Sequence, residues 1–158
     1  MRKLLSLAAA IAACSATAEV KTFQDVMGRE VSVDVPVKRA ILTFYYPDYI
    51  AVAGAENFKQ VVGISREFWE KFNPGSWGLY VEKMPDLVNI VDVGYATNNN
   101  FSTEKALALN PDVLIVPKIQ MGALESELPY FEKAGVPVVV VDFNDQTVEN
   151  HRKSAEIF

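Results

Sequence analysis

The stretch STEKALALNPDVLIV, residues 102–116, decides the fold because it joins a helix to a buried strand. Ser102 can cap a helix that runs to Leu109, and Glu104 lies in the first turn, where a carboxylate faces the positive end of the helix dipole. The run Val113–Val116 is continuously apolar, which is typical of a strand buried on both faces of a parallel sheet. The stretch therefore predicts one helix and strand of an α/β fold.

Four more apolar runs repeat this pattern along the chain. They are Ala40–Phe44, Val61–Ile64, Ile90–Val93 and Val138–Val141. Helices are predicted between the runs, at Asp48–Ala55 and at Leu124–Ala134, and Gly135 can close the second of these. Because strands and helices alternate, the sequence predicts an α/β fold with a mostly parallel sheet flanked by helices.

Three other segments complete the organisation. A hairpin is predicted at the start, with Thr22–Val26 and Arg29–Val33 on either side of a turn at Met27-Gly28. The long connection from Glu67 to Pro85 carries Trp69 and Trp77, and the sequence leaves open whether it covers a cleft or packs on the surface. A last helix is predicted to begin near Thr147.

The first residues resemble a secretory signal. A charged start is followed by an apolar run of about ten residues, half of the roughly twenty that span a bilayer. Ala16-Thr17-Ala18 suits cleavage before Glu19, so residues 1–18 are predicted to be removed. Ile11-Ala12-Ala13-Cys14 also resembles a lipobox, in which Cys14 would be acylated and would anchor the protein to the membrane. Cleavage before Glu19 is the favoured interpretation because the shorter signal falls below the usual length.

The predicted mature chain is acidic. The signal carries two cations and no acid, so its removal takes the formal net charge from −5 to −7. An acidic domain is a poor nucleic-acid binder, and no cysteine pair remains to form a disulfide.

Aromatic residues, amides and cations follow the predicted strands, where ligands of parallel sheets bind. The candidate ligand contacts are Tyr45, Tyr46, Arg66, Tyr95 and Lys118. Two cations among tyrosines suit a bulky, partly aromatic anion.

Each candidate contact also has a purely structural interpretation. A tyrosine at a strand end can cap the core with its hydroxyl in water, and Arg66 can form a surface ion pair with Glu67. The run Asn98–Asn100 can adapt to polar edges of a ligand, but it is more typical of a flexible loop.

Signals for catalysis are weak. The sequence has no glycine-rich phosphate loop and no nucleophile elbow, and its single histidine, His151, lies among charged residues of the predicted last helix. One histidine excludes a multi-histidine metal site from this chain alone. We therefore predict no catalytic residue and no metal ligand; the alternative is an exported hydrolase that uses Asp48, Asp92 or Asp112.

Four stretches together resemble the periplasmic substrate-binding proteins of iron-siderophore, haem and cobalamin ABC importers. They are Phe23–Val31, Pro36–Ile41, Val62-Gly63-Ile64 and Glu104–Ile115, of which the last is the most specific. The resemblance implies two α/β lobes joined by one long helix, with the ligand between the lobes. It implies that residues 19–146 are the N-terminal ligand-binding lobe and that residues 147–158 begin the connecting helix, which is cut short.

The resemblance also implies the partners. Glu104 matches the glutamate that this family uses to grip arginines on the permease in the inner membrane. The five candidate contacts fall where family members place their ligand, although only the positions transfer and not the identities. We therefore expect a monomeric periplasmic binding protein that is not an enzyme, has no resident cofactor and delivers a metal chelate. Arg66, Lys118 and the tyrosines favour an anionic iron chelate over neutral cobalamin. The expected ligand is a ferric siderophore, with haem and cobalamin as the less favoured ligands. A third interpretation is a module that docks to membrane partners through its acidic surface.

Overall fold

A parallel five-stranded sheet forms the centre of the molecule. The computed structural model describes residues 19–145 and 147–158, so the predicted signal lies outside the described residues. The strands are β3 (Ala40–Leu42), β4 (Val61–Ile64), β5 (Val91–Asp92), β6 (Val113–Pro117) and β7 (Val138–Val141). They lie in the order β5-β4-β3-β6-β7, and all neighbours are parallel. The predicted fold class and all five predicted strands are confirmed, although the first and third strands are shorter than predicted.

Both faces of the sheet are buried, which explains why the strands are continuously apolar. Leu114 and Val116 belong to one cluster of buried side chains, and Val113 and Ile115 belong to another. Since successive side chains of a strand point to opposite faces, the two clusters are the cores above and below the sheet.

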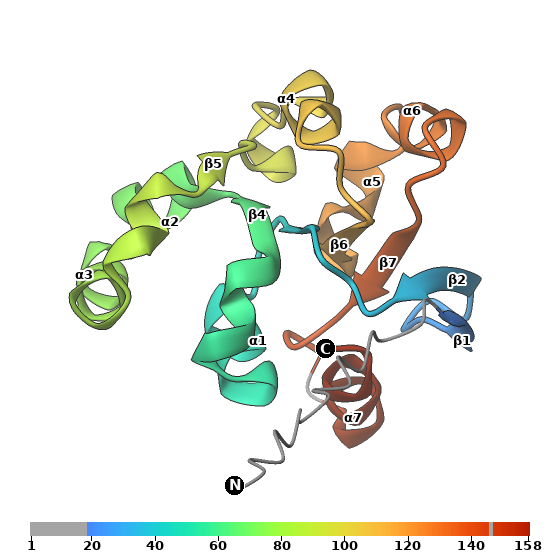
Figure 1. The fold of residues 1–158 in the computed structure, drawn as a ribbon, viewed down its shortest axis with the longest axis horizontal. Coiled ribbons are helices and arrows are strands. Elements are labelled where there is room, and N and C mark those ends of the chain that lie inside the picture. Colours follow the sequence, from blue (N-terminus) through green and yellow to red (C-terminus); the bar gives the residue numbers. More distant parts are fainter. Residues whose placement is uncertain (1–18, 146) are drawn as a thin grey trace, which may run out of the picture.

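Helices cover the two faces. The α-helices of the described residues are α1 (Tyr46–Ala53), α2 (Arg66–Phe72), α3 (Pro74–Lys83), α4 (Thr103–Ala108), α5 (Met121–Leu124), α6 (Leu128–Lys133) and α7 (Val148–Ile157). Short 3-10 turns are η1 (Ala55–Gln60), η2 (Pro85–Asn89), η3 (Ala96–Asn98) and η4 (Lys118–Gln120). Figure 1 shows α1 and α7 on one side of the sheet and α4, α5 and α6 on the other. None of the helices in the described part of the chain is long and apolar enough to cross a membrane.

The helix predicted over Leu124–Ala134 is wrong as a single element. The chain forms α5 and then α6, with a break at residues 125–127. Pro129 lies in the first turn of α6, where a missing N–H is harmless; inside a continuous helix it would remove a hydrogen bond and clash with the preceding turn. The other caps are as predicted: the Ser102 hydroxyl accepts from the amide of Lys105, and Gly135 ends α6 with a φ of +71°.

The predicted hairpin consists of β1 (Glu19–Gln24) and β2 (Glu30–Val35), which pair in antiparallel fashion. Its turn is fastened to the sheet by Asp25, whose side chain is fully buried. The Asp25 carboxylate receives two hydrogen bonds from the Arg29 guanidinium, at 2.9 and 2.6 Å, and a third from the amide of Val140 at 3.3 Å. The Arg29 guanidinium also donates to the carbonyl of Val138, so the hairpin is held against β7.

The long connection packs into the core through both tryptophans. Trp69 of α2 and Trp77 of α3 are each less than a tenth exposed. Their rings meet the edge of Tyr46 at centroid distances of 4.8 and 5.8 Å. The sequence left open whether this connection covers a cleft or packs on the surface. In the structure, its two tryptophans belong to the core beside α1.

The last described helix, α7, is also anchored. The Thr147 hydroxyl caps it by accepting from the amide of Asn150, and the ring of Phe158 packs on Tyr49 and Phe143 at 5.2 and 5.4 Å. Ser154 is fully buried and exchanges hydrogen bonds with the backbone of Asp142. That this helix begins the connection to a second lobe stays a prediction.

Candidate functional site

The order of the strands points to one edge of the sheet as the place for a ligand. From β3 the chain builds β4 and β5 on one side, then crosses to build β6 and β7 on the other. Ligands of open α/β sheets bind outside the carboxyl ends of the strands where the order reverses, which is here between β3 and β6. The residues after these two strands are therefore the first candidates for the site.

Tyr45 follows β3 and adopts an unusual backbone conformation. Its φ of 51° and ψ of 29° lie in the left-handed region, which is rare for a bulky residue and tends to occur at functional sites. The side chain is 3% exposed and packs against Phe44 and Phe143. Its hydroxyl lies near the backbone amides of Phe143 and Asn144 without an ordinary hydrogen bond, and burial raises the pKa of Tyr45 to about 12.

Tyr46 points inward. It is 1% exposed and lies among the rings of Phe58, Trp69, Trp77 and Tyr80. Burial raises the pKa of Tyr46 to about 12 as well. Its side chain is enclosed by other core residues, and the ligand contact predicted for Tyr46 stays a prediction.

The two predicted cations point to opposite sides of β3. The Arg66 guanidinium donates to the carbonyl of Val88 at 2.7 Å, just before the edge strand β5, and lies 3.7 Å from Glu70. The Lys118 ammonium lies 3.9 Å from Asp142 and 3.8 Å from Asp145, beyond β7. Arg66 and Lys118 follow strands that are two positions apart, roughly 10 Å at the usual strand spacing. Each cation is already partnered by acids, so the edge is less cationic than the sequence suggested.

Tyr95 lies in a tightly built loop after β5. Its amide donates to the Asn100 side chain at 2.7 Å, which closes residues 95–100 into a turn. The Ser65 hydroxyl donates to the carbonyl of Gly94, and the Ser102 amide donates to the carbonyl of Val93. The flexible loop that the sequence favoured for Asn98–Asn100 is therefore a hydrogen-bonded turn instead.

Tyr95 belongs to a group of aromatic rings that sequence reasoning missed. The ring of Phe68 lies 4.3 Å from Tyr95 and 5.2 Å from Phe72, and Phe44 contacts both Tyr95 and Phe68. Phe72 is 66% exposed. The signal for this group was present, since Phe68 and Phe72 are four residues apart on a helix that follows a strand and therefore share one face.

Glu104 is exposed at the second position of α4, after the Ser102 cap. The neighbouring Thr103 hydroxyl donates to the carboxylate of Glu127, the residue before α6. Within the described residues, the Glu104 carboxylate forms no hydrogen bond or ion pair, and its position faces solvent. The structure thus leaves it accessible to a partner.

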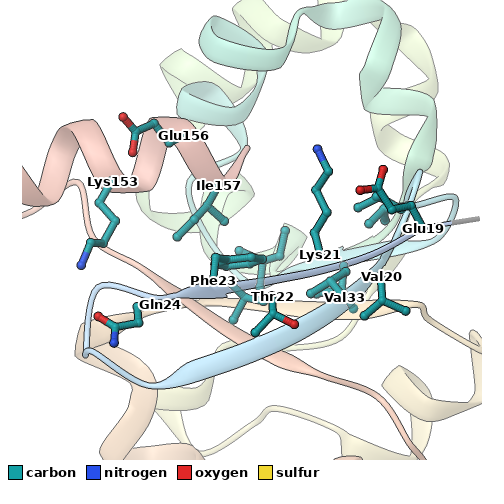
Figure 2. Close-up of a pocket in the computed structure, with 15 residues that line it drawn as sticks. Glu19, Val20, Lys21, Thr22, Phe23, Gln24, Val33, Lys153, Glu156 and Ile157 are labelled. Atoms are coloured by element: carbon teal, nitrogen blue, oxygen red, sulfur yellow. The ribbon is translucent and has the colours of Figure 1, made fainter.

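A groove of about 610 Å³ lies elsewhere, between β1 and α7. Figure 2 shows Ile157 of α7 pointing toward β1, whose Lys21 and Glu19 project from the rim. The floor is apolar and includes Val113, Ile115 and Val139. None of the predicted ligand contacts lines this groove.

The three acids of the alternative hydrolase do not form one site. Asp112 precedes β6, at the amino edge of the sheet, and accepts the amides of Lys38 and Arg39. Asp92 ends β5 and accepts the amide of Gly94, whereas Asp48 lies in α1 with a pKa raised by burial. Within the described residues no three acidic, cysteine or histidine side chains are placed to hold a metal ion.

Comparison with known proteins identifies the fold. No family model and no curated protein matched the sequence. Among solved structures, the TroA-like periplasmic binding protein FepB from Veillonella parvula matches with a TM-score of 0.77 and 27% identity, over 84% of this chain and 40% of that one. The molybdate-binding protein MolA of Haemophilus influenzae matches with a TM-score of 0.61 and 25% identity, over 84% of this chain and 38% of that one.

The haem-binding protein HmuT shares the fold at 19% identity and a TM-score of 0.56, over 94% of this chain and 42% of that one. The chain therefore spans about 40% of the length of the solved proteins it matches.

Proposed function

We propose that this chain, which has the fold of a lobe of the TroA-like periplasmic binding proteins, is the N-terminal ligand-binding part of an exported component of an ABC importer. Its neighbours in fold are binding proteins rather than enzymes, and the scattered positions of Asp48, Asp92 and Asp112 give the hydrolase no support. The acidic chain delivers its ligand to a permease of the inner membrane, with Glu104 as the docking contact.

The proposed ligand is a metal chelate, and a ferric siderophore fits best. The observation that carries this choice is the surface beside the switch point, where rings from three strand ends meet: Phe44 after β3, Phe68 after β4 and Tyr95 after β5. Such a surface suits a bulky ligand with apolar or aromatic parts.

The proposed contacts are Tyr45, Tyr46, Tyr95, Arg66 and Lys118, of which the two tyrosines after β3 are buried in this structure. An anionic chelate would compete with Glu70 for Arg66 and with Asp142 and Asp145 for Lys118. Replacing Arg66 by alanine is expected to weaken binding of an anionic chelate by about 1–3 kcal/mol, the range for a charge-assisted hydrogen bond, and to affect a neutral analogue less.

Calorimetry of residues 19–158 with ferric siderophores, haem, cobalamin and molybdate tests the proposal. We expect saturable binding of at least one ferric siderophore in the high micromolar range, because one lobe covers only about half of a ligand. Tighter binding of molybdate or cobalamin than of every ferric siderophore would contradict the ligand class. A nanomolar dissociation constant would show instead that this lobe carries a complete site.

A further inference from the structure

We propose that a small hollow between α2 and the loop of residues 94–100 binds one hydroxylated aromatic ring of the ligand, a phenol or a catechol. We call it the ring pocket. This inference rests on the proposed function, since it names the chemical group by which the chelate is recognised. The pocket is lined by Glu67, Phe68, Lys71, Phe72, Tyr95, Asn98 and Asn100.

The ring pocket has the volume of a single ring. It measures about 130 Å³, and apolar cavities of roughly 150 Å³ in proteins bind benzene. A haem or a corrin is several times larger and would cover the pocket without entering it. The size therefore suits a group about as large as one six-membered ring that projects from a larger ligand.

The apolar wall of the ring pocket is aromatic and partly unpartnered. Phe68 packs on Tyr95 with ring centroids 4.3 Å apart and planes 35° apart, and Phe72 continues the wall at 5.2 Å from Phe68. The core already covers one part of this wall, yet 66% of Phe72 is left in water. A ring inserted beside Phe72 would gain the offset-stacked geometry that aromatic pairs prefer.

The opposite wall is rigid. Gly94 has a φ of +81°, and the carbonyl of Asn100 packs directly against it, so the loop folds back on its own start. The hydrogen bond from the Tyr95 amide to the Asn100 side chain holds this turn closed, and the Ser65 hydroxyl ties it to the end of β4. A wall fixed before the ligand arrives loses little conformational freedom on binding.

The polar groups of the ring pocket suit hydroxyls better than a free anion. Glu67 and Lys71 form an ion pair at one side, so their charges cancel. Lys71 holds the pKa of Glu67 below its ordinary range through a hydrogen bond, which keeps this group a carboxylate that can only accept. A ring hydroxyl can donate a further hydrogen bond to this carboxylate, which already accepts from Lys71, and the amide of Asn98 offers both a donor and an acceptor.

The ring pocket is tested with catechol itself, titrated into isotope-labelled protein of residues 19–158 and followed by NMR. The matched control ligand is trans-1,2-cyclohexanediol, which keeps both hydroxyls but has no aromatic face. We expect catechol to shift the side-chain amide signals of Asn98 and Asn100 with a dissociation constant in the low millimolar range, typical of a fragment of eight heavy atoms. The diol should bind at least fivefold more weakly.

Variants separate the ring pocket from other surfaces. Phe72→Ala should weaken catechol about three- to tenfold through the loss of one stacked ring. Leu79→Ala is the matched control, because Leu79 is 68% exposed on the neighbouring helix α3 and lies outside the pocket. Equal binding of catechol and the diol, or equal effects of the two variants, would overturn the inference.

Failure of this inference is distinguishable from failure of the proposed function. If ferric siderophores bind and Phe72→Ala changes neither their affinity nor that of catechol, the ring pocket is wrong and the binding function stands. If catechol binds as expected while no ferric chelate binds, the pocket stands and the proposed ligand class is wrong.

Discussion

Replacing Gly94 by alanine should destabilise this protein far more than an ordinary glycine substitution. A Cβ at position 94 would lie 2.0 Å from the carbonyl oxygen of Asn100 and 2.6 Å from its carbonyl carbon. Both contacts are with backbone, which cannot swing aside as a side chain would. The turn of residues 95–100 must therefore move by more than an ångström.

The expected loss combines two effects. A non-glycine residue at positive φ costs about 1–2 kcal/mol. Moving the turn also strains or breaks the hydrogen bonds from Tyr95 to Asn100 and from Ser102 to Val93, each of which contributes about 1 kcal/mol. We expect a total loss of about 3–5 kcal/mol, a large part of the 5–15 kcal/mol that stabilises a typical domain.

Urea unfolding followed by the fluorescence of Trp69 and Trp77 measures this loss. The matched control is Gly135→Ala, because Gly135 has a φ of +71° and a Cβ there would meet nothing within 4 Å. The control should lose only the 1–2 kcal/mol of the backbone conformation. If the two variants lose the same free energy of unfolding, the steric argument at Gly94 is refuted.

Four further outcomes are expected. Asp25→Ala should cost about 3 kcal/mol in urea unfolding, because it leaves the Arg29 guanidinium without its buried partner, and a loss below 1 kcal/mol would show that the hairpin is not fastened there. Burial raises the pKa of Tyr45 to about 12, so the stability that its protonated form contributes is present below pH 10 and is lost as the pH rises toward 12. Tyr45→Phe should therefore flatten the dependence of the free energy of unfolding on pH between about 10 and 12. An unchanged dependence would contradict the raised pKa. Glu104→Gln in the whole binding protein should leave ligand affinity and stability nearly unchanged but slow transport, and loss of ligand binding with normal coupling would exclude the docking role. Intact mass spectrometry of the exported protein should give the mass of a chain that begins at Glu19, whereas a diacylglyceryl adduct on Cys14 would mean a lipid anchor.

The strands were predictable because their burial leaves a direct trace in the sequence. Val113–Val116 and Val138–Val141 are apolar at every position, and only a strand covered on both faces needs this. The Ser102 cap was predictable for a similar reason, since the capping side chain and the amide it accepts are three residues apart.

Contacts between distant segments were not predictable. Arg66 was expected to face a ligand or Glu67, but it donates to Val88, which is 22 residues away and lies beside it only after β4 and β5 have paired. Tyr45 and Tyr46 are adjacent in sequence, yet the left-handed backbone at Tyr45 sends one ring toward Phe143 and the other into the core. Sequence position thus predicts which edge of the sheet these residues share but not which neighbours their side chains contact.

The fastening of the hairpin at Asp25 has a consequence for the order of folding. The amide of Val140 that binds Asp25 is 115 residues further along the chain, and so are the strands on which the hairpin rests. A two-stranded hairpin is marginally stable in water, and contacts across such a separation form slowly because a long loop must close first. The hairpin, although made early in synthesis, is therefore among the last segments to reach its native place. For the exported protein proposed above, this order would leave the hairpin undocked until β7, the last strand of the sheet, has arrived.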